Sequence, residues 1–553
     1  MVGIPVLILG SNQRMLPVMK VRNSVKVMSS ILGGMLFLSM PAPAGSAPAP
    51  VSLDVVEREI DAWRLESARA KVDRLNLDAS EDPIAAYLAG KLLFFEGDPQ
   101  NALKKLRAAI EGNRAELEWK SVRDRAEATE KVFSRLEYQK GPSGKFHYRF
   151  TPGIDEILVG YADAALVRQL GQLEKLLGDV PKRPIEVDLL PDTAALSAVS
   201  GLSQEQIERT GTVGVTKYGR IMIVSPRSLV KGYPWLDTLA HELTHFVINR
   251  VSGNFAPIWL HEGIAKLFER KWRSDKLQEL TPEEAYLLDR AVKEGRIIPL
   301  RRFHPSVAYL SDQEEAALAY AQVLSFLHYL DNRMPEDWIR RLLEGLGDGQ
   351  NINGVLVSLN NVNLQRLFAW WRKSAMGRQH TPTPAVGLLK RQFKRGEVAA
   401  GEPEESLHIL EVRRHLRLGD LLRLRGHIEA AVQEFKQANE LARSPSPEIS
   451  DRLAAALLEL GQTGEVVTLL EPMVNLYPSH ATTYIQLAKG LAGQNALDKA
   501  INALDRANAI NPFDPDIHCL LSTLYFETDQ QDASAGEKAV CQTTLAGAGK
   551  KMK

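Results

Sequence analysis

Cysteine is scarce in this sequence, and neither sign of charge is in excess. The 553 residues contain two cysteines, and Lys plus Arg total 68 against 68 for Asp plus Glu. Two cysteines exclude a small fold held together by a disulfide framework. The balanced charge gives no reason to expect nucleic acid or an anionic membrane surface as the main partner. Cys519 and Cys541 could pair in an oxidising compartment or remain two buried thiols, and the sequence leaves both open.

Long apolar runs are also missing after the first 50 residues. Within residues 1–47, basic residues between positions 20 and 26 precede an apolar run from Ile31 to Met40, and small residues follow. This order is typical of a secretory signal peptide. The run is shorter than the ~20 residues that a spanning helix needs, and an uncleaved N-terminal anchor is the alternative. We therefore expect a periplasmic or secreted protein with no stable membrane span after signal removal.

The length predicts three or more structural units, because one hydrophobic core does not grow to 553 residues. In residues 51–140 the apolar residues recur at helical spacing. Small and large residues stand where the two helices of a tetratricopeptide repeat cross. These residues are Gly90, Leu93, Ala102, Leu106 and Ala109. The sequence predicts a helical region with tetratricopeptide character before the next domain.

A change of pattern follows Gly141–Gly144, because residues 145–150 alternate as a strand does. Further strands are predicted at Ile185–Leu190 and Arg220–Val224, with helices from Trp235 to about Met376. The fold class expected for the chain is therefore multidomain. An α+β domain at residues 145–376 would be flanked on both sides by all-α helical hairpins.

The C-terminal third repeats itself. Ala431, Val466 and Ala500 are 35 and 34 residues apart, and two further sets of apolar positions keep the same phase. This period predicts tetratricopeptide repeats at residues 406–545, with three clear units and a degenerate fourth from Asp514 to about Cys541. Stacked helical hairpins form an extended concave surface, so a protein partner is expected there. Residues 377–405 are predicted as a linker, in which residues 388–393 could form a short helix, and residues 546–553 as a polar tail.

One motif carries the chemistry: His241-Glu242-Leu243-Thr244-His245. Residues four apart lie on one face of a helix, so both imidazoles can bind one zinc ion with Glu242 beside it. The flanking residues are apolar on most sides, which predicts a buried helix. A buried carboxylate needs a partner, and zinc with a polarised water would provide one. The alternative is a pair of core histidines satisfied by hydrogen bonds.

A catalytic zinc site needs a third protein ligand and one open position. Glu262 lies 17 residues after His245, on a helix predicted at Ile258–Phe268. His261 is the competing ligand, but it lies about 100° from Glu262 around that helix. Glu262 is preferred. A purely structural zinc is disfavoured because such sites are usually rich in cysteine, and none is near.

The motif at residues 241–245, together with Pro257-Ile258-Trp259-Leu260-His261-Glu262-Gly263-Ile264-Ala265, resembles the paired helices of the gluzincins, the thermolysin-like (peptidase MA-like) zinc metallopeptidases. The resemblance implies that Glu262 is the third ligand to one zinc ion. It also implies that the strand at Arg220–Val224 pairs with an extended substrate backbone. The family's aminopeptidases carry a Gly-x-Met-x-Asn segment, which is absent from this sequence. An endopeptidase is therefore favoured over an aminopeptidase.

These features predict a secreted zinc-dependent peptidase with a protein or peptide substrate. Glu242 would act as general base toward a zinc-activated water and then pass the proton to the leaving amine. Enzymes of this kind also use a Tyr or His donor at the oxyanion, and Tyr320 is the candidate, although it could equally be a packed core tyrosine. The alternative from another class is a non-enzymatic adaptor in which the repeats bind a partner and the peptidase-like domain is only a scaffold.

Overall fold

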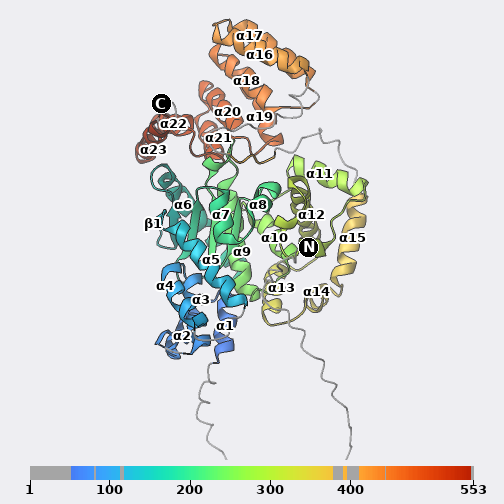
Figure 1. The fold of residues 1–553 in the computed structure, drawn as a ribbon. Helices are drawn as coiled ribbons and strands as arrows, with labels where there is room; N and C mark the ends of the chain where they lie inside the picture. Colours follow the sequence, from blue (N-terminus) through green and yellow to red (C-terminus); the bar gives the residue numbers. More distant parts are fainter. Residues whose placement is uncertain are drawn as a thin grey trace, which may run out of the picture.

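The computed structural model describes residues 52–79, 82–111, 117–377, 390–394, 410–442 and 444–549. The predicted signal peptide at residues 1–47 lies outside these ranges. Within them, no helix is both long enough and apolar enough to cross a membrane. Figure 1 shows the N-terminal helices, the sheet with its covering helices, and the C-terminal helix pairs arranged one after another along the molecule.

The N-terminal helices pair as hairpins, and the Gly90–Leu106 crossing predicted from the sequence is present. A Cβ added to Gly90 would lie 2.9 Å from Leu106 Cγ, so the close approach requires glycine. These helices share one continuous hydrophobic core with the sheet and its covering helices. The helices of this region are α1 (Leu53–Asp61), α2 (Leu65–Arg74), α3 (Pro83–Phe95), α4 (Pro99–Glu111) and α5 (Leu117–Phe133).

The sheet has five strands in the order β1-β2-β3-β5-β4. The three inner strands run parallel, and β1 and β4 are antiparallel edge strands. Inner strands β3 and β5 are buried at every position, as expected where helices cover both faces of a parallel sheet. The strands are β1 (Glu137–Lys140), β2 (Phe146–Phe150), β3 (Ile185–Leu190), β4 (Gly214–Lys217) and β5 (Arg220–Val224).

Two sequence expectations change with this sheet. Strand β1 falls inside residues 51–140, which were expected to be helical throughout, because it forms a hairpin with β2 across the glycine-containing turn at 141–144. In addition, β5 is an inner strand between β3 and β4. Its backbone groups are used on both sides, so the prediction that Arg220–Val224 pairs with a substrate is wrong.

Helices account for the rest of this domain, and from Trp235 to Met376 the chain is mainly helical, as predicted. Helix α9 ends at Gly253, whose φ of 60° is the left-handed conformation that closes many helices. The helices are α6 (Ile157–Leu177), α7 (Thr193–Ser200), α8 (Gln204–Thr210), α9 (Trp235–Ser252), α10 (Ile258–Phe268), α11 (Pro282–Lys293), α12 (Gln313–Asp331), α13 (Trp338–Gly347), α14 (Ile352–Asn360) and α15 (Leu364–Met376).

The C-terminal region consists of successive helix pairs around a second, separate core. Gly419 in the first pair lies against Phe435, the small-to-large contact expected at a tetratricopeptide crossing. The pairs are α16 (Leu410–Leu424) with α17 (Ile428–Leu441), α18 (Pro447–Glu459) with α19 (Thr463–Leu476), α20 (Ala481–Gly493) with α21 (Leu497–Asn508), and α22 (Pro515–Glu527) with α23 (Gln531–Gly549).

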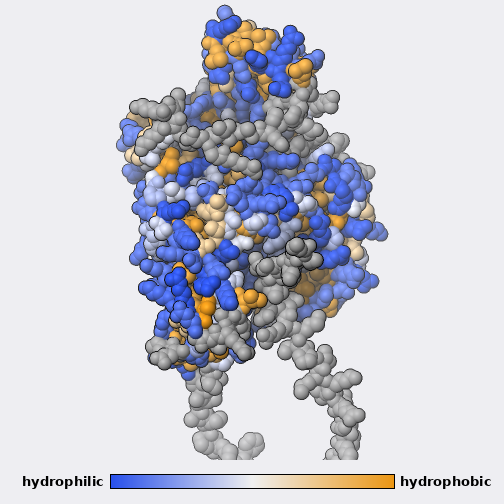
Figure 2. Space-filling view, viewed as in Figure 1, coloured by the Kyte–Doolittle hydropathy of each residue, from blue (hydrophilic) through white to orange (hydrophobic). Residues whose placement is uncertain are grey.

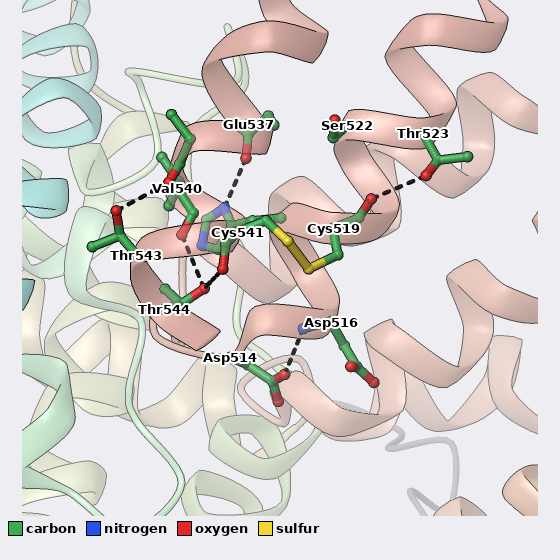
Figure 3. The surroundings of a disulfide bond; sticks show 12 residues. Asp514, Asp516, Cys519, Ser522, Thr523, Glu537, Val540, Cys541, Thr543 and Thr544 are labelled. Atoms are coloured by element: carbon green, nitrogen blue, oxygen red, sulfur yellow. Dashed lines mark hydrogen bonds and ion pairs between the residues drawn. A yellow bond between two sulfur atoms is a disulfide. The ribbon is translucent and has the colours of Figure 1, made fainter. Parts of the chain in front are cut away.

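The last pair differs from the prediction at its end. Helix α23 continues to Gly549, so the expected polar tail at 546–553 begins as helix. A Cβ on Gly547 would lie 2.7 Å from Ile154 Cδ1, which places this end against the α+β domain. Cys519 of α22 and Cys541 of α23 are paired, which answers the question left open by the sequence (Figure 3).

Residues 390–394, from the predicted linker, lie along the α+β domain. Phe393 forms an antiparallel bridge with Leu229, and Val230 N–H donates to the Gln392 carbonyl at 2.9 Å. The described part of the short helix predicted at 388–393 is therefore extended, because its backbone groups pair with residues 228–230. We call residues 390–394 the strap.

The repeats dock on the loop that leads into α9. Tyr233 N–H donates to the Ile510 carbonyl at 3.0 Å, and Trp235 N–H donates to the Ala509 carbonyl at 3.1 Å. A Cβ on Gly232 would collide with the Ile510 carbonyl oxygen, so this approach also requires glycine. The repeats are thus joined to the segment that opens the His-Glu helix.

Candidate metal centre

Helices α9 and α10 are held at a fixed distance by a buried glutamine from α6. Gln169 Nε2 donates to Thr244 Oγ1 of α9 and to the Phe268 carbonyl of α10, both at 3.1 Å. Its side chain is fully buried. A buried amide with partners on two helices restricts how those helices can shift. The helix pair therefore presents its inward side chains in one arrangement.

Three of those side chains meet at one point. His241 Nε2 and His245 Nε2 are 3.1 Å apart, and each lies 3.4 Å from Glu262 Oε2. With ligand distances of 2.0–2.2 Å, two ligands of a tetrahedral zinc lie about 3.3 Å apart. The buried Glu262 Oε2 has no hydrogen-bond partner among the described residues. Donor types, spacing and this unsatisfied oxygen all fit a divalent cation such as zinc.

The charges of these groups depend on one another. Burial alone would lower the pKa of His241, but the facing carboxylates of Glu262 and Glu269 raise it to about 9. Burial opposes ionisation of Glu262, yet the facing His245 and His241 hold the pKa of this carboxyl well below its usual range. Glu262 is therefore an anion at neutral pH, and a cation bound at this point would compete with the histidine protons.

A second carboxylate orients His241 from behind. Glu269 Oε2 lies 3.5 Å from His241 Nδ1, and Lys266 Nζ donates to Glu269 Oε1 at 2.8 Å. Burial would raise the pKa of Glu269, but Lys266 and His241 lower it to about 2. A carboxylate on the far nitrogen of a ligating histidine fixes its ring and tautomer.

Glu242 lies beside the cluster and is held by the edge strand. Thr216 Oγ1 donates to Glu242 Oε2 at 2.7 Å. A Cβ on Gly214 would lie 2.7 Å from Glu242 Oε1, so only glycine leaves room for this carboxylate. Burial raises the pKa of Glu242 against the opposing effect of the two histidines. A buried carboxylate with a raised pKa is suited to accept and return a proton.

Tyr320 borders the same site from α12. Its ring lies edge-on to the His241 ring, with centroids 6.0 Å apart. Helix α12 comes this close because Gly263 of α10 leaves space for Leu327, which would lie 3.0 Å from an added Cβ. Burial, followed by the charges of Glu262 and Glu242, raises the pKa of Tyr320 well above its usual value. Tyr320 thus keeps its proton and can donate it in a hydrogen bond.

His261, the competing ligand, points elsewhere. It is buried with its ring centroid 5.5 Å from that of His245, outside the three converging ligand atoms. Burial, reinforced by His245, lowers the pKa of His261 to about 3, so it is neutral. The structure therefore brings His241, His245 and Glu262 together, with Glu242 and Tyr320 at the border.

Strand β4 is the edge strand that lies next to Glu242. Val224 N–H donates to the Val213 carbonyl, so residues 215 and 217 also face β5 in this antiparallel pair. The backbone groups of Gly214 and Thr216 consequently point away from β5.

Several contributors to the site were not identified from the sequence. Thr216 and Gly214 lie on a four-residue strand without a clear period. The position of Glu269 was a weak indication of its role, since it follows Glu262 by two helical turns and lies on the same face of the helix.

Comparison with known proteins supports the α+β region. Residues 162–377 match the family model described as Peptidase MA superfamily. That match includes α9, α10 and α12 and ends before the strap. No curated protein matches this chain.

Among solved structures, the chain is similar to "MamA 41-end from Desulfovibrio magneticus RS-1", at 22% identity over 25% of this chain and 78% of that one, with a TM-score of 0.23. A thermophilic TPR protein of Thermus thermophilus matches at 23% identity, over 24% of this chain and 73% of that one, with a TM-score of 0.22. The APC/C hetero-tetramer Cut9-Hcn1 matches at 10% identity over 90% of this chain and 67% of that one, with a TM-score of 0.21. The repeat assignment rests on the helix pairs described above.

Proposed function

We propose that this protein is a zinc-dependent peptidase, with His241, His245 and Glu262 as metal ligands and Glu242 as general base. The observation that carries this proposal is the convergence of three ligand atoms within 3.1–3.4 Å of one another beside a buried, hydrogen-bonded glutamate. The match of residues 162–377 to the Peptidase MA superfamily supports the same reaction class.

When bound, zinc supplies a Lewis acid that polarises a carbonyl and acidifies water. The chain's own groups handle the proton. Glu242 takes a proton from the attacking water and returns it to the leaving amine, while Thr216 holds its Oε2 in place. Tyr320 donates a hydrogen bond to the oxygen that gains negative charge. Glu269 keeps the His241 ring oriented.

The substrate we propose is an extended peptide added to the edge of β4. The outward backbone groups of Gly214 and Thr216 offer the hydrogen bonds of an additional strand. Cleavage within a chain is favoured, because a strand-like site grips backbone on both sides of the scissile bond. The enzyme is accordingly proposed to be an endopeptidase.

A periplasmic or secreted location is part of this proposal. It is supported by the signal-like order of residues 1–47 and by the paired Cys519 and Cys541, since disulfides persist in oxidising compartments.

The repeats are proposed to recruit a protein partner or substrate. Figure 2 shows hydrophobic residues gathered over the outermost repeat, around α16 and α17. Exposed leucines on α16 contribute to this surface: Leu410, Leu418, Leu421 and Leu424. Such an apolar surface also favours the second candidate function, an adaptor that binds a partner and cleaves nothing.

The test is to measure zinc content and cleavage of an unfolded protein substrate for the wild type, Glu242→Gln and His245→Ala. Zinc at about one ion per chain is expected in the wild type and in Glu242→Gln. Cleavage by Glu242→Gln should fall by at least about 10²-fold, because general base catalysis contributes that much. His245→Ala should lose both zinc and cleavage.

Two results would go against the proposal. Absence of zinc from the wild type at saturating supply would show that the ligand assignment is wrong. Zinc in both the wild type and Glu242→Gln, with no cleavage by either, would favour the adaptor.

A further inference from the structure

The strap places a cation beside the segment that leads into β4. Arg391 is the second residue of the strap, and its Nη1 donates to the Gly211 carbonyl at 2.7 Å, three residues before β4 begins. Its guanidinium carbon lies 5.9 Å from the centre of the Tyr233 ring, within the reach of a cation–π contact. The residue as a whole is exposed, although burial around the guanidinium lowers the pKa of Arg391. The protein thus holds the guanidinium in place beside Gly211 and Tyr233.

The backbone of Arg391 is fixed as well. Its N–H donates to Gln313 Oε1 at 2.7 Å, and its carbonyl accepts from Gln313 Nε2 at 3.0 Å. Gln313 begins α12, the helix that carries Tyr320. A side chain on Gly211 would collide with Gln313, since an added Cβ would lie 2.9 Å from its amide. Arg391 is therefore clamped between the approach to β4 and the helix that borders the metal centre.

The charge of Arg391 reaches the site. Burial raises the pKa of Tyr320 and of Tyr233, and in both cases Arg391 acts in the opposite direction. The Glu242 carboxylate acts to raise the pKa of both tyrosines, and the Glu269 carboxylate acts to raise the pKa of Tyr320 and of Arg391. A guanidinium that acts electrostatically on Tyr320 affects which substrate charges are tolerated there.

We propose that Arg391 determines specificity by binding a carboxylate of the substrate on the C-terminal side of the scissile bond. This inference rests on the proposed peptidase function. A peptide lying antiparallel to β4 runs from the Lys217 end toward Gly214 and then toward Gly211. At about 3.3 Å per residue, Arg391 meets the peptide about two to four residues beyond the bond next to Glu242. Arginine is suited to this role because its planar fork matches a carboxylate.

Two sources could supply that carboxylate: an Asp or Glu side chain, or the free C-terminus of a short peptide. Quenched fluorescent peptides separate them. One series places Glu or Gln at the second to fourth positions after the cleaved bond, with an amidated end. The other series has neutral side chains throughout and carries either a free or an amidated C-terminus.

The variants are Arg391→Gln, Arg391→Glu and the matched control Lys390→Gln, which removes a charge from the same strap. The wild type should prefer the carboxylate peptide of one series by about tenfold in kcat/KM, mostly through KM, which corresponds to about 1.4 kcal/mol. Arg391→Gln should bring this ratio close to one, and Arg391→Glu should reverse it, so that the neutral peptide of the same pair is preferred. Lys390→Gln should keep the wild-type ratio. Preference in the first series identifies a side chain, and preference in the second identifies a chain end.

Binding without turnover separates this inference from the proposed reaction. Anisotropy of the labelled peptides is measured on Glu242→Gln and on Glu242→Gln with Arg391→Gln. Carboxylate preference in the first protein and its loss in the second support the role of Arg391, even if the wild type cleaves nothing. Cleavage or binding with the same ratio in the wild type and Arg391→Gln would overturn it, and so would an equal loss of preference in Lys390→Gln. A strap that serves only stability would lower the melting temperature of Arg391→Gln without changing the ratio.

Discussion

The two hydrophobic cores of this molecule are built differently. The first combines residues from Val56 to Ala375 with Ala509 of the repeat region, so helices from the N-terminal region and the sheet bury one another. The second, in the repeats, is made by neighbouring helix pairs between Val412 and Leu524. Contacts between distant segments make the first core cooperative, whereas the second depends on nearest neighbours. The N-terminal helices therefore belong to the unit that carries the candidate metal centre.

The largest effect should come from removing one aromatic ring from each core. Phe94 and Phe435 are both fully buried, Phe94 in α3 under the Arg220 guanidinium and Phe435 in the repeats. Each change to alanine should cost about 3–5 kcal/mol. In scanning calorimetry, Phe94→Ala should lower the transition of the α+β unit and Phe435→Ala that of the repeats. If both variants shift the same single transition, the two cores unfold as one.

A smaller effect is expected from the disulfide, which belongs to the repeats alone. Cys519 and Cys541 are 22 residues apart in sequence, and opening a loop of this size costs about 3 kcal/mol. Reductant should lower the repeat transition and leave the first transition in place. Cys541→Ser should reproduce the shift and make the protein insensitive to reductant. A shift of both transitions would show that the fourth helix pair stabilises the α+β unit too.

Acid should lower the unfolding free energy of the repeats through a buried histidine near the α+β domain. His480 is buried in the repeats, and burial together with Lys231 from the α+β domain lowers its pKa to about 3, outweighing Asp451 at 3.3 Å. The folded protein thus keeps His480 neutral while the unfolded chain takes up a proton below its ordinary pKa near 6.5. The unfolding free energy of the repeats should fall by about 1 kcal/mol from pH 7 to pH 5.5. His480→Gln should flatten this slope, and an unchanged slope would contradict the assignment.

The smallest effect concerns a single hydrogen bond between the units. Tyr161 of α6 donates to Glu537 Oε1 of α23 at 2.9 Å. Tyr161→Phe should lower the unfolding free energy of the repeats by about 0.5–1.5 kcal/mol. The loss stays small because Glu537 keeps its contact with His518. Thr543→Val, on the exposed side of the same helix, is a control that should have little effect. Equal shifts for the two variants would show that the contact contributes nothing specific.

The sequence predicted the helices best where the period was long and the punctuation strong. Helix α10 has the bounds expected for it, and the repeat pairs follow the 34-residue spacing. The ends were less predictable: α23 continues through small residues because Ile154, far away in the chain, covers Gly547. Strand β1 was missed because its side chains are mostly exposed, so no apolar alternation marks it.

The candidate site was predictable in its local part only. His241 and His245 are four residues apart on one helix, and their spacing alone brings the imidazoles together. The contact of Thr216 with Glu242 depends on the order of strands in the sheet. The contact of Arg391 with the Gly211 carbonyl depends on the path of the strap along the α+β domain. Such long-range placement leaves no periodic trace in a single sequence. The same reason explains why β5 was mistaken for the edge strand.

One backbone hydrogen bond between the two units has a consequence for how they evolve together. Trp235, the first residue of α9, has its N–H bonded to the Ala509 carbonyl, and Pro234 before it provides no side-chain cap. The helix that carries both histidines is thus completed by the Ala509 carbonyl, which directly follows α21 in the third helix pair. A recombination event that exchanged the repeats for another array would leave this helix end without its acceptor. The two halves are therefore expected to be inherited as a matched pair, with substitutions at residues 232–235 and 508–511 accompanying one another.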